Sequence, residues 1–217
     1  MGRWALLCNV LFLGCGSQPL PPVSISSVVP GTMVASQPTV VQVQVVAQLA
    51  VNVDYGQSTL AVNTQMQVHI GPLGLGTGSY PTGGLVEGTL PTLLPPGTYN
   101  ATVEMGDGRS ALSQGAFTVT PGTWPSAYTV DPIGDPQHSG MSFPVTLRAV
   151  GPEAPSFEGN VLLSLIGSGT LTPAVSGAFS AGQRVETVVV TGMGDFTLVV
   201  SDIAGDTGQS PPFTVGP

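Results

Sequence analysis

Residues 94–105 read Leu-Pro-Pro-Gly-Thr-Tyr-Asn-Ala-Thr-Val-Glu-Met, a turn signal followed by a strand signal. Proline presets the first corner of a turn and glycine permits positive φ, so Pro95-Pro96-Gly97 predicts a turn. The residues that follow alternate strictly in polarity, with Tyr99, Ala101, Val103 and Met105 on the apolar side and Asn100, Thr102 and Glu104 on the polar side. This period of two predicts a β-strand with one buried face.

The same alternation recurs along the chain, and clusters of glycine, proline and aspartate separate the runs. The apolar sets are Val41, Val43 and Val45; Met66, Val68 and Ile70; Phe143, Val145, Leu147 and Ala149; and Phe196, Leu198 and Val200. We find no window of sustained helical periodicity with capping residues. The sequence therefore predicts an all-β protein.

The composition excludes several function classes. Among 217 residues there are 4 Lys+Arg and 12 Asp+Glu, for a net charge of −8, so nothing attracts nucleic acid. Charged residues make up only 7% of the chain, which leaves few groups for catalysis. We expect no enzymatic activity and no cofactor.

The first residues have the pattern of an export signal. Arg3 precedes an apolar stretch, Trp4–Gly14, that is shorter than the ~20 residues of a transmembrane helix and fits the ~7–15 of a signal peptide. Phe12-Leu13-Gly14-Cys15 resembles the processing box of bacterial lipoproteins. The resemblance implies that residues 1–14 are a signal peptide and that Cys15 is lipidated. Because Gly16 and not Asp follows, it also implies the outer membrane of the bacterial envelope.

Residues 15–22 would then form a lipidated, proline-rich tether. The alternative is an ordinary secreted protein, cleaved nearby, in which Cys15 has no role. Both cysteines, Cys8 and Cys15, lie in this segment, so we expect no disulfide in the mature body.

Two halves end alike, in Phe117-Thr118-Val119 and Phe213-Thr214-Val215. Their separation is close to the ~100 residues of one immunoglobulin-type sandwich. We expect one domain over residues 23–120, a linker over 121–125 and a second domain over 126–217. The fold prediction is two tandem immunoglobulin-like β-sandwiches after an N-terminal signal peptide.

Both halves also resemble known families. The first resembles IPT/TIG-type immunoglobulin-like domains in its Ile25–Pro30, Val53–Gly56, Leu94–Val103 and Ala116–Val119 segments. The second is similar to bacterial surface immunoglobulin-like repeats in Gly140–Leu147, Phe157–Leu163 and its closing stretch from Ala204 to Val215. These resemblances imply a fold and say nothing about a ligand.

Two acidic groups are candidate metal sites. Asp131, Asp135 and His138 have ligand-type side chains, but interleaved prolines and a glycine favour a solvated turn. Asp202 and Asp206 flank Gly205 and could contribute oxygens to a weak calcium site, although turn aspartates are the simpler interpretation. We therefore expect no metal.

Of the aromatic residues, we expect Tyr80, Trp124 and Tyr128 to be exposed, and exposed rings of this kind are candidates for stacking against sugar rings. For Trp124, which lies in the expected linker, packing between the two domains is the favoured interpretation. Gly74–Gly78 superficially suggests a phosphate-binding loop, but no helix pattern follows it, so we expect a glycine-rich surface loop over residues 71–88.

Together these observations predict a non-enzymatic envelope lipoprotein with a structural, adhesive or protein-binding role. Its expected partners are the membrane, through the N-terminal lipid, and an envelope protein or glycan, but no nucleic acid. One alternative is a carbohydrate-binding accessory module on the cell surface. A second is a non-catalytic subunit of an envelope enzyme complex.

Overall fold

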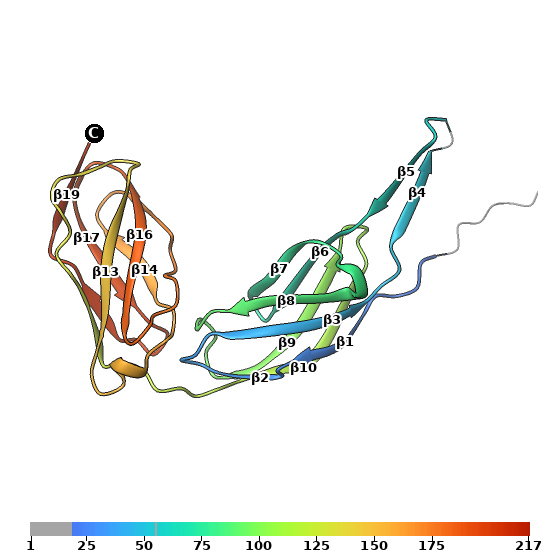
Figure 1. Ribbon diagram of the computed structural model, residues 1–217, viewed down its shortest axis with the longest axis horizontal. Coiled ribbons are helices and arrows are strands. Elements are labelled where there is room, and N and C mark those ends of the chain that lie inside the picture. Colours follow the sequence, from blue (N-terminus) through green and yellow to red (C-terminus); the bar gives the residue numbers. More distant parts are fainter. Residues whose placement is uncertain (1–18, 55) are drawn as a thin grey trace, which may run out of the picture.

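A computed structural model describes residues 19–54 and 56–217, which form two β-sandwiches that meet at an angle (Figure 1). The prediction of an all-β protein is confirmed. The helical elements in the described part of the chain are two single 3-10 turns, η1 (Thr82–Gly84) and η2 (Ala154–Ser156).

The N-terminal sandwich has a three-stranded and a five-stranded sheet. The first has the order β1-β3-β8, with β1 (Ser24–Val29), β3 (Thr39–Val46) and β8 (Leu85–Leu90). The second has the order β2-β10-β9-β6-β7, with β2 (Thr32–Val34), β10 (Ser110–Thr120), β9 (Gly97–Met105), β6 (Gln65–Ile70) and β7 (Leu73–Ser79). Neighbouring strands are antiparallel except β2, which runs parallel to β10.

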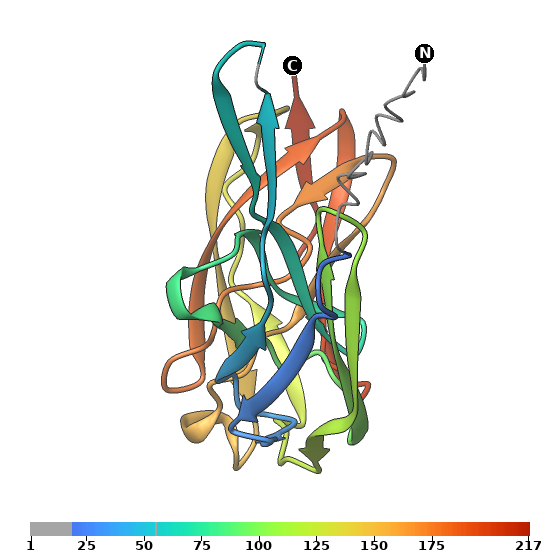
Figure 2. The ribbon, with the colours of Figure 1, turned by 90° about the vertical axis from the view of Figure 1, so that its right-hand side faces the viewer.

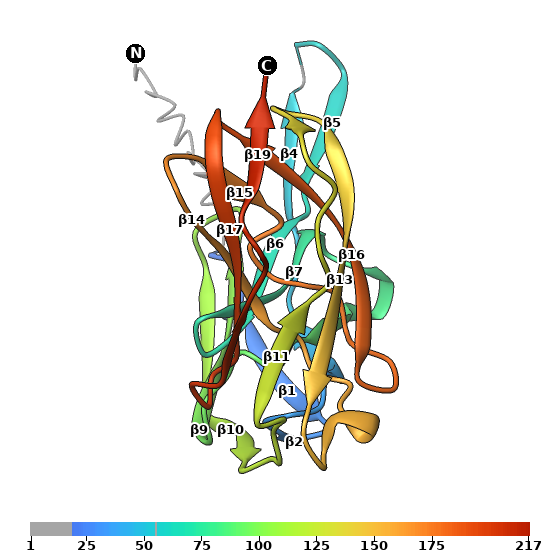
Figure 3. The same cartoon turned by 90° about the vertical axis from the view of Figure 1, so that its left-hand side faces the viewer.

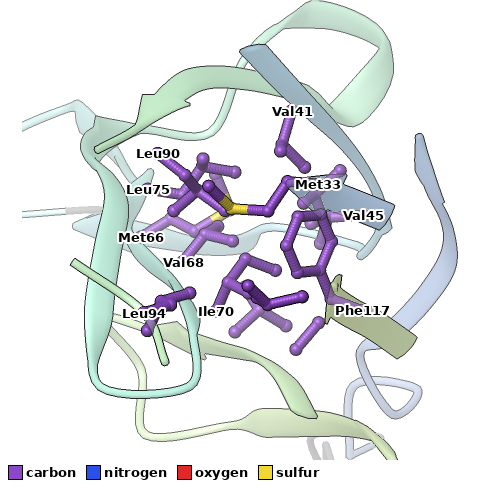
Figure 4. Packing of buried hydrophobic residues seen from close by; sticks show 14 of the residues in the cluster. Met33, Val41, Val45, Met66, Val68, Ile70, Leu75, Leu90, Leu94 and Phe117 are labelled. Carbon is purple, nitrogen blue, oxygen red and sulfur yellow. The ribbon is translucent and has the colours of Figure 1, made fainter. Parts of the chain in front are cut away.

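The alternating apolar residues of these strands meet between the two sheets (Figure 4). Val41, Val43 and Val45 of β3 are fully buried, as are Val68 and Ile70 of β6. Phe117, also fully buried, packs among them with the sulfur-bearing side chains of Met33 and Met66. The inward faces predicted from the alternation are confirmed.

The C-terminal sandwich has a corresponding pair of sheets. One has the order β11-β13-β16-β15, with β11 (Ala127–Val130), β13 (Ser142–Val150), β16 (Gln183–Thr191) and β15 (Thr170–Thr172). The other has the order β12-β19-β17-β14, with β12 (Gln137–His138), β19 (Phe213–Gly216), β17 (Gly194–Ser201) and β14 (Leu162–Ile166), and β18 (Thr207–Gln209) pairs with β17. Figure 3, which looks onto this sandwich, shows β13 and β16 on one side and β17 and β19 on the other.

The strand order makes both sandwiches immunoglobulin-like. That fold places its strands A, B and E in one sheet and C, F and G in the other. Here β1, β3 and β8 face β6, β9 and β10, and β11, β13 and β16 face β14, β17 and β19. Tyr99, near the start of β9, donates a hydrogen bond from its hydroxyl to the Pro95 carbonyl at 2.7 Å, as in the tyrosine corner of such folds.

The prediction of a glycine-rich surface loop over residues 71–88 is wrong. Most of this segment is β7 and β8, the edge strands of the two sheets, joined by η1. In β7, Gly76 lies opposite Val68 and Gly78 opposite Met66. A neighbouring strand supplies the backbone hydrogen bonds here, so a sequence with weak strand propensity is still extended.

A further hairpin, β4 (Ala50–Asp54) with β5 (Thr59–Asn63), stands apart from both sandwiches. It lies between β3 and β6, in the position of the B–C loop of an immunoglobulin fold. Figure 1 shows it projecting beyond the end of the N-terminal sandwich that is farthest from the C-terminal one, and Figure 2, which looks onto that end, shows it in front.

The sandwiches meet through a buried joint. Thr92 of the first donates its hydroxyl to the Asn160 carbonyl of the second at 2.9 Å and accepts the Asn160 N–H at 2.6 Å. Trp124, in the connecting segment, packs against both cores, and its ring centroid lies 5.9 Å from that of Phe157. Ile203 of the second sandwich packs against the core of the first. These contacts join the sandwiches into one elongated unit.

Candidate interaction sites at the two poles

The acidic residues singled out from the sequence form separate local structures. Asp131 pairs with Arg148 at 2.9 Å, and this hydrogen bond holds the pKa of Asp131 below its usual value. Asp135 accepts the backbone N–H of Thr214 at 2.9 Å, and His138 Nδ1 lies 2.8 Å from the Pro217 carbonyl oxygen. Each side chain thus has a structural partner of its own.

Asp202 organises the turn before β18. Its Oδ1 accepts the backbone N–H groups of Ala204, Gly205 and Asp206, each at 2.9 to 3.0 Å. Its Oδ2 accepts the hydroxyl of Tyr128 at 2.9 Å. Both carboxylate oxygens are therefore engaged within the fold. In the part of the chain that the structure describes, no group of three or more His, Cys, Asp or Glu side chains is placed to hold a metal ion.

The three aromatic candidates are packed into the fold to different degrees. Tyr128 is 3% exposed, so the exposure expected for it is wrong; burial, followed by the hydrogen bond to Asp202, raises the pKa of its hydroxyl. Trp124 packs between the two cores, as the favoured interpretation predicted. Tyr80 is half-buried, and its hydroxyl donates to the Val45 carbonyl at 3.0 Å.

The pole that bears the hairpin is organised around Arg109, which follows the β9–β10 turn. Its guanidinium donates to the Pro21 carbonyl at 2.8 Å and to the Gln48 carbonyl at 2.5 Å. It also pairs with Asp107 at 2.7 Å, a hydrogen bond that lowers the pKa of that carboxyl. Arg109 thus joins the segment that enters β1 to the segment that leaves β3 for the hairpin. Sequence reasoning missed it because Pro21 and Gln48 are 88 and 61 residues away.

Both legs of the hairpin are held where they leave the sandwich. On the first leg, Tyr80 and Arg109 bind the backbone of Val45 and Gln48. On the second leg, the Thr64 carbonyl accepts the Tyr80 N–H, and the Gln65 carbonyl accepts the Gly106 N–H at 2.7 Å. The direction in which the hairpin projects is therefore set at its root.

Beyond this root, the hairpin presents an apolar face to solvent. Val51 lies opposite Val62, and Leu60 is two residues from Val62 on the same strand, so the three side chains share a face. Their exposed fractions are 55%, 65% and 40% for Val51, Leu60 and Val62. We call these three residues the hairpin face.

Two shallow hollows adjoin the edge strand β7. One, of about 410 Å³, is lined by β6, β7 and β9, and the other, of about 260 Å³, lies between β7 and β8. Both are lined by Met66 and Gly78. A Cβ atom at Gly78 would meet nothing within 4 Å, so the missing side chain helps to leave this space open. Glu104 lines the first hollow and Glu87 the second.

The opposite pole of the molecule carries two exposed methionines. Met141, just before β13, and Met193, just before β17, are 64% and 68% exposed. A hydrogen bond from the Gly192 N–H to the Ser139 hydroxyl, 3.1 Å long, ties the two turns together. Methionine adapts its shape to different partners, so these two side chains are candidates for a contact surface.

Cys15 and the predicted signal peptide lie outside the described residues. In residues 19–54 and 56–217, no helix has both the length and the apolar character to cross a bilayer.

No protein-family model and no curated protein matches this sequence. Among solved structures, the adhesin InvE of Yersinia pseudotuberculosis is 16% identical, with a TM-score of 0.36, and the alignment covers 90% of this chain and 59% of that one. The Escherichia coli adhesin FdeC is 17% identical, with a TM-score of 0.33 and coverages of 92% and 65%. Domains 4 and 5 of the S-layer protein SbsC are 13% identical, with a TM-score of 0.33 and coverages of 92% and 100%. These scores are too low to carry an argument about function, and the immunoglobulin-like assignment here rests on strand order.

Proposed function

We propose that this chain is a non-catalytic envelope lipoprotein that acts as a rigid spacer. Cys15 would carry the lipid, and the two sandwiches would hold the far pole, with Met141 and Met193, away from the membrane for contact with an envelope protein or glycan. The observation that carries the proposal is the buried joint between the sandwiches. Two domains that merely connected a lipid anchor to a binding site could be joined by a flexible linker. A rigid spacer needs a fixed angle between its two domains.

The joint is built to resist bending. Thr92 is fully buried and Asn160 is 8% exposed, so separating the sandwiches would expose and unpair their polar groups. Buried polar groups left without partners cost about 1–3 kcal/mol each. The amide nitrogen of Asn160 also donates to the Ser176 carbonyl at 2.9 Å, which fixes the Asn160 side chain within its own sandwich.

The chain direction agrees with an anchor at one end. The tether joins the N-terminal sandwich at the pole that Arg109 organises, and the methionine pair lies on the other sandwich beyond the joint. A single acyl chain binds membranes only marginally, and two or more anchor stably, which is the chemistry that a bacterial lipoprotein cysteine supplies.

Expression of the full chain in a bacterial host tests the anchor. We expect the wild type and Cys8→Ser to incorporate labelled palmitate and to sediment with membranes, because Cys8 lies within the predicted signal peptide. Cys15→Ser should lose both the label and the membrane fraction. Palmitate labelling that survives Cys15→Ser would refute the lipid anchor and favour the secreted alternative.

The contact pole is tested separately by capture from intact envelopes with purified protein. A double variant, Met141→Ser with Met193→Ser, should lose the captured partner. A variant with Leu112→Ser, an exposed leucine of β10 in the N-terminal sandwich, should keep it. Equal capture by both variants would place the partner contact elsewhere.

A further inference from the structure

We propose that the hairpin of β4 and β5 is a membrane contact, with the hairpin face resting in the headgroup region of the bilayer to which the chain is anchored. This inference rests on the proposed lipid anchor at Cys15. The hairpin is a different part of the molecule from Cys15, so its contact with the membrane is tested by a different measurement.

The tether and the hairpin have a similar reach. Arg109 binds the Pro21 and Gln48 carbonyls with one guanidinium, so the tether and the hairpin start from the same point. Cys15 is six residues before Pro21, and Asp54 is six residues after Gln48. An extended chain advances ~3.3 Å per residue, so each segment spans at most about 20 Å. A lipid on Cys15 therefore cannot hold this pole farther from the bilayer than about the length of the hairpin.

The hairpin points toward the side from which the tether arrives. It projects past the end of the sandwich at which residues 19–23 enter (Figure 1). Contacts at both of its legs hold it there, through Tyr80 and Arg109 on one side and the Thr64 and Gln65 carbonyls on the other. A bilayer at the end of a tether that leaves from this pole would meet the hairpin before any other strand.

The composition of the hairpin suits a membrane surface. Between residues 47 and 65 the only charged residue is Asp54, so moving this segment out of bulk water desolvates few charges. The hairpin face offers three aliphatic side chains that are 40–65% exposed. A two-stranded hairpin is at best marginally stable in water, and an apolar surface that covers one face would stabilise it.

The backbone of the hairpin limits how deeply the hairpin can enter the bilayer. A two-stranded ribbon leaves the outer edge of each strand without a partner, and unpaired backbone groups are costly in hydrocarbon. The hairpin is thus suited to the interface, where headgroups and water can accept and donate hydrogen bonds, and unsuited to the bilayer centre. The face opposite Val51, Leu60 and Val62 carries Ala61 and Asn63, both exposed, and would be turned toward water.

Quenching of tryptophan emission by brominated lipids tests the proposal. The purified mature lipoprotein is incorporated into phosphatidylethanolamine–phosphatidylglycerol vesicles that contain phosphatidylcholine brominated either near the headgroup or deep in the acyl chain. Trp124 supplies a constant background, because the other tryptophan, Trp4, lies in the predicted signal peptide. Three variants are compared: Leu60→Trp on the hairpin face, Ala61→Trp on the opposite face, and Met193→Trp at the far pole.

We expect the Leu60→Trp variant to lose most of its added emission, more with shallow than with deep bromines. The Ala61→Trp variant should lose less, and the Met193→Trp variant none. Equal quenching of the Leu60→Trp and Met193→Trp variants on vesicles that float with the protein would overturn the proposal, as would quenching by deep bromines alone.

Two further outcomes distinguish a failure of the lipid anchor from a failure of the hairpin contact. If wild-type protein carries no lipid and does not float with vesicles, the anchor is refuted and the hairpin contact falls with it. If the Leu60→Trp emission is already blue-shifted without vesicles and shifts back on dilution, a second copy of the chain covers the hairpin face, and the membrane contact is wrong.

Discussion

The Arg109 guanidinium donates a 2.5 Å hydrogen bond to the backbone carbonyl of Gln48, 61 residues earlier in the chain. The same guanidinium holds the Pro21 carbonyl and the Asp107 carboxylate. One side chain therefore fixes where the tether enters the fold and where the hairpin leaves it. Arginine suits this position because its planar fork presents several donors at once, whereas a lysine ammonium acts as a point charge.

Replacing Arg109 should loosen this pole without unfolding the protein. In Arg109→Gln, two hydrogen bonds to backbone carbonyls are lost, each worth about 0.5–1.5 kcal/mol. Amide hydrogen exchange should accelerate at Leu20, at Val23 and in residues 47–54, and stay unchanged in β13 and β16 of the other sandwich. The variant Arg109→Lys keeps the charge but not the fork, so it should exchange almost as fast. Wild-type protection in Arg109→Lys would show that charge alone holds the pole.

Thr92→Val should weaken the joint. The valine has nearly the same shape but cannot accept the Asn160 N–H or donate to its carbonyl, so buried polar groups lose their partners at about 1–3 kcal/mol. We expect lower stability in urea unfolding and a wider spread of inter-sandwich angles in small-angle scattering. The matched control is Thr89→Val, an exposed threonine of β8 that should change neither. Unchanged scattering of Thr92→Val would mean that Trp124 and Ile203 suffice to hold the angle.

Two tyrosine hydroxyls offer a matched comparison. Tyr128→Phe removes the donor from a buried carboxylate oxygen of Asp202, and hydrogen bonds to charged groups contribute about 1.5–3 kcal/mol. Tyr99→Phe removes a bond to the Pro95 carbonyl, a neutral acceptor at an exposed corner, so about 0.5–1.5 kcal/mol is expected. Chemical denaturation measures both. A larger loss for Tyr99→Phe would contradict the view that burial and charge govern these two bonds.

Acid should destabilise the C-terminal sandwich through Glu186. Burial acts to raise the pKa of Glu186, but hydrogen bonds from Arg184 and from the Gly177 N–H outweigh it and lower the pKa. A carboxyl with a lowered folded-state pKa contributes stability above its unfolded pKa of about 4.3, and that stability is lost as pH falls through the folded value.

The free energy of unfolding should therefore fall below about pH 5, and less steeply in Glu186→Gln. Arg184→Gln should share the shallower slope, because it removes the main hydrogen bond that lowers the pKa. Unfolding in urea at a series of pH values gives the slopes. Parallel curves for wild type and both variants would assign the acid sensitivity to other carboxyls.

The strands that alternate in polarity could be predicted from sequence because alternation is a local property of the extended backbone. Val41, Val43 and Val45 are all fully buried, and so are Leu147 of β13 and Val200 of β17. The strand β7 could not be predicted in this way. Its glycines carry no side chains to alternate, and pairing with β6 supplies the order that the local sequence lacks.

Site residues were harder to predict than strands. Tyr128 was expected to be exposed, since an aromatic residue beside a proline-glycine linker gives no local sign of burial. It is buried because Phe157 and Phe179 pack against its ring, and Asp202, 74 residues later, accepts its hydroxyl. The packing of Trp124 could be predicted because Trp124 lies in the linker between two expected domains, and the position of a linker can be found from the sequence alone.

The sequence by itself determined the all-β class, the inward faces of the alternating strands and the turns that glycine and proline punctuate, because these depend on neighbouring residues. Only the tertiary structure decided that Thr92 meets Asn160, that Arg109 joins Pro21 to Gln48, and that the hairpin face is left uncovered. Those relationships join residues 61 to 88 positions apart, and their partners are chosen by how the sheets stack, which no local pattern records.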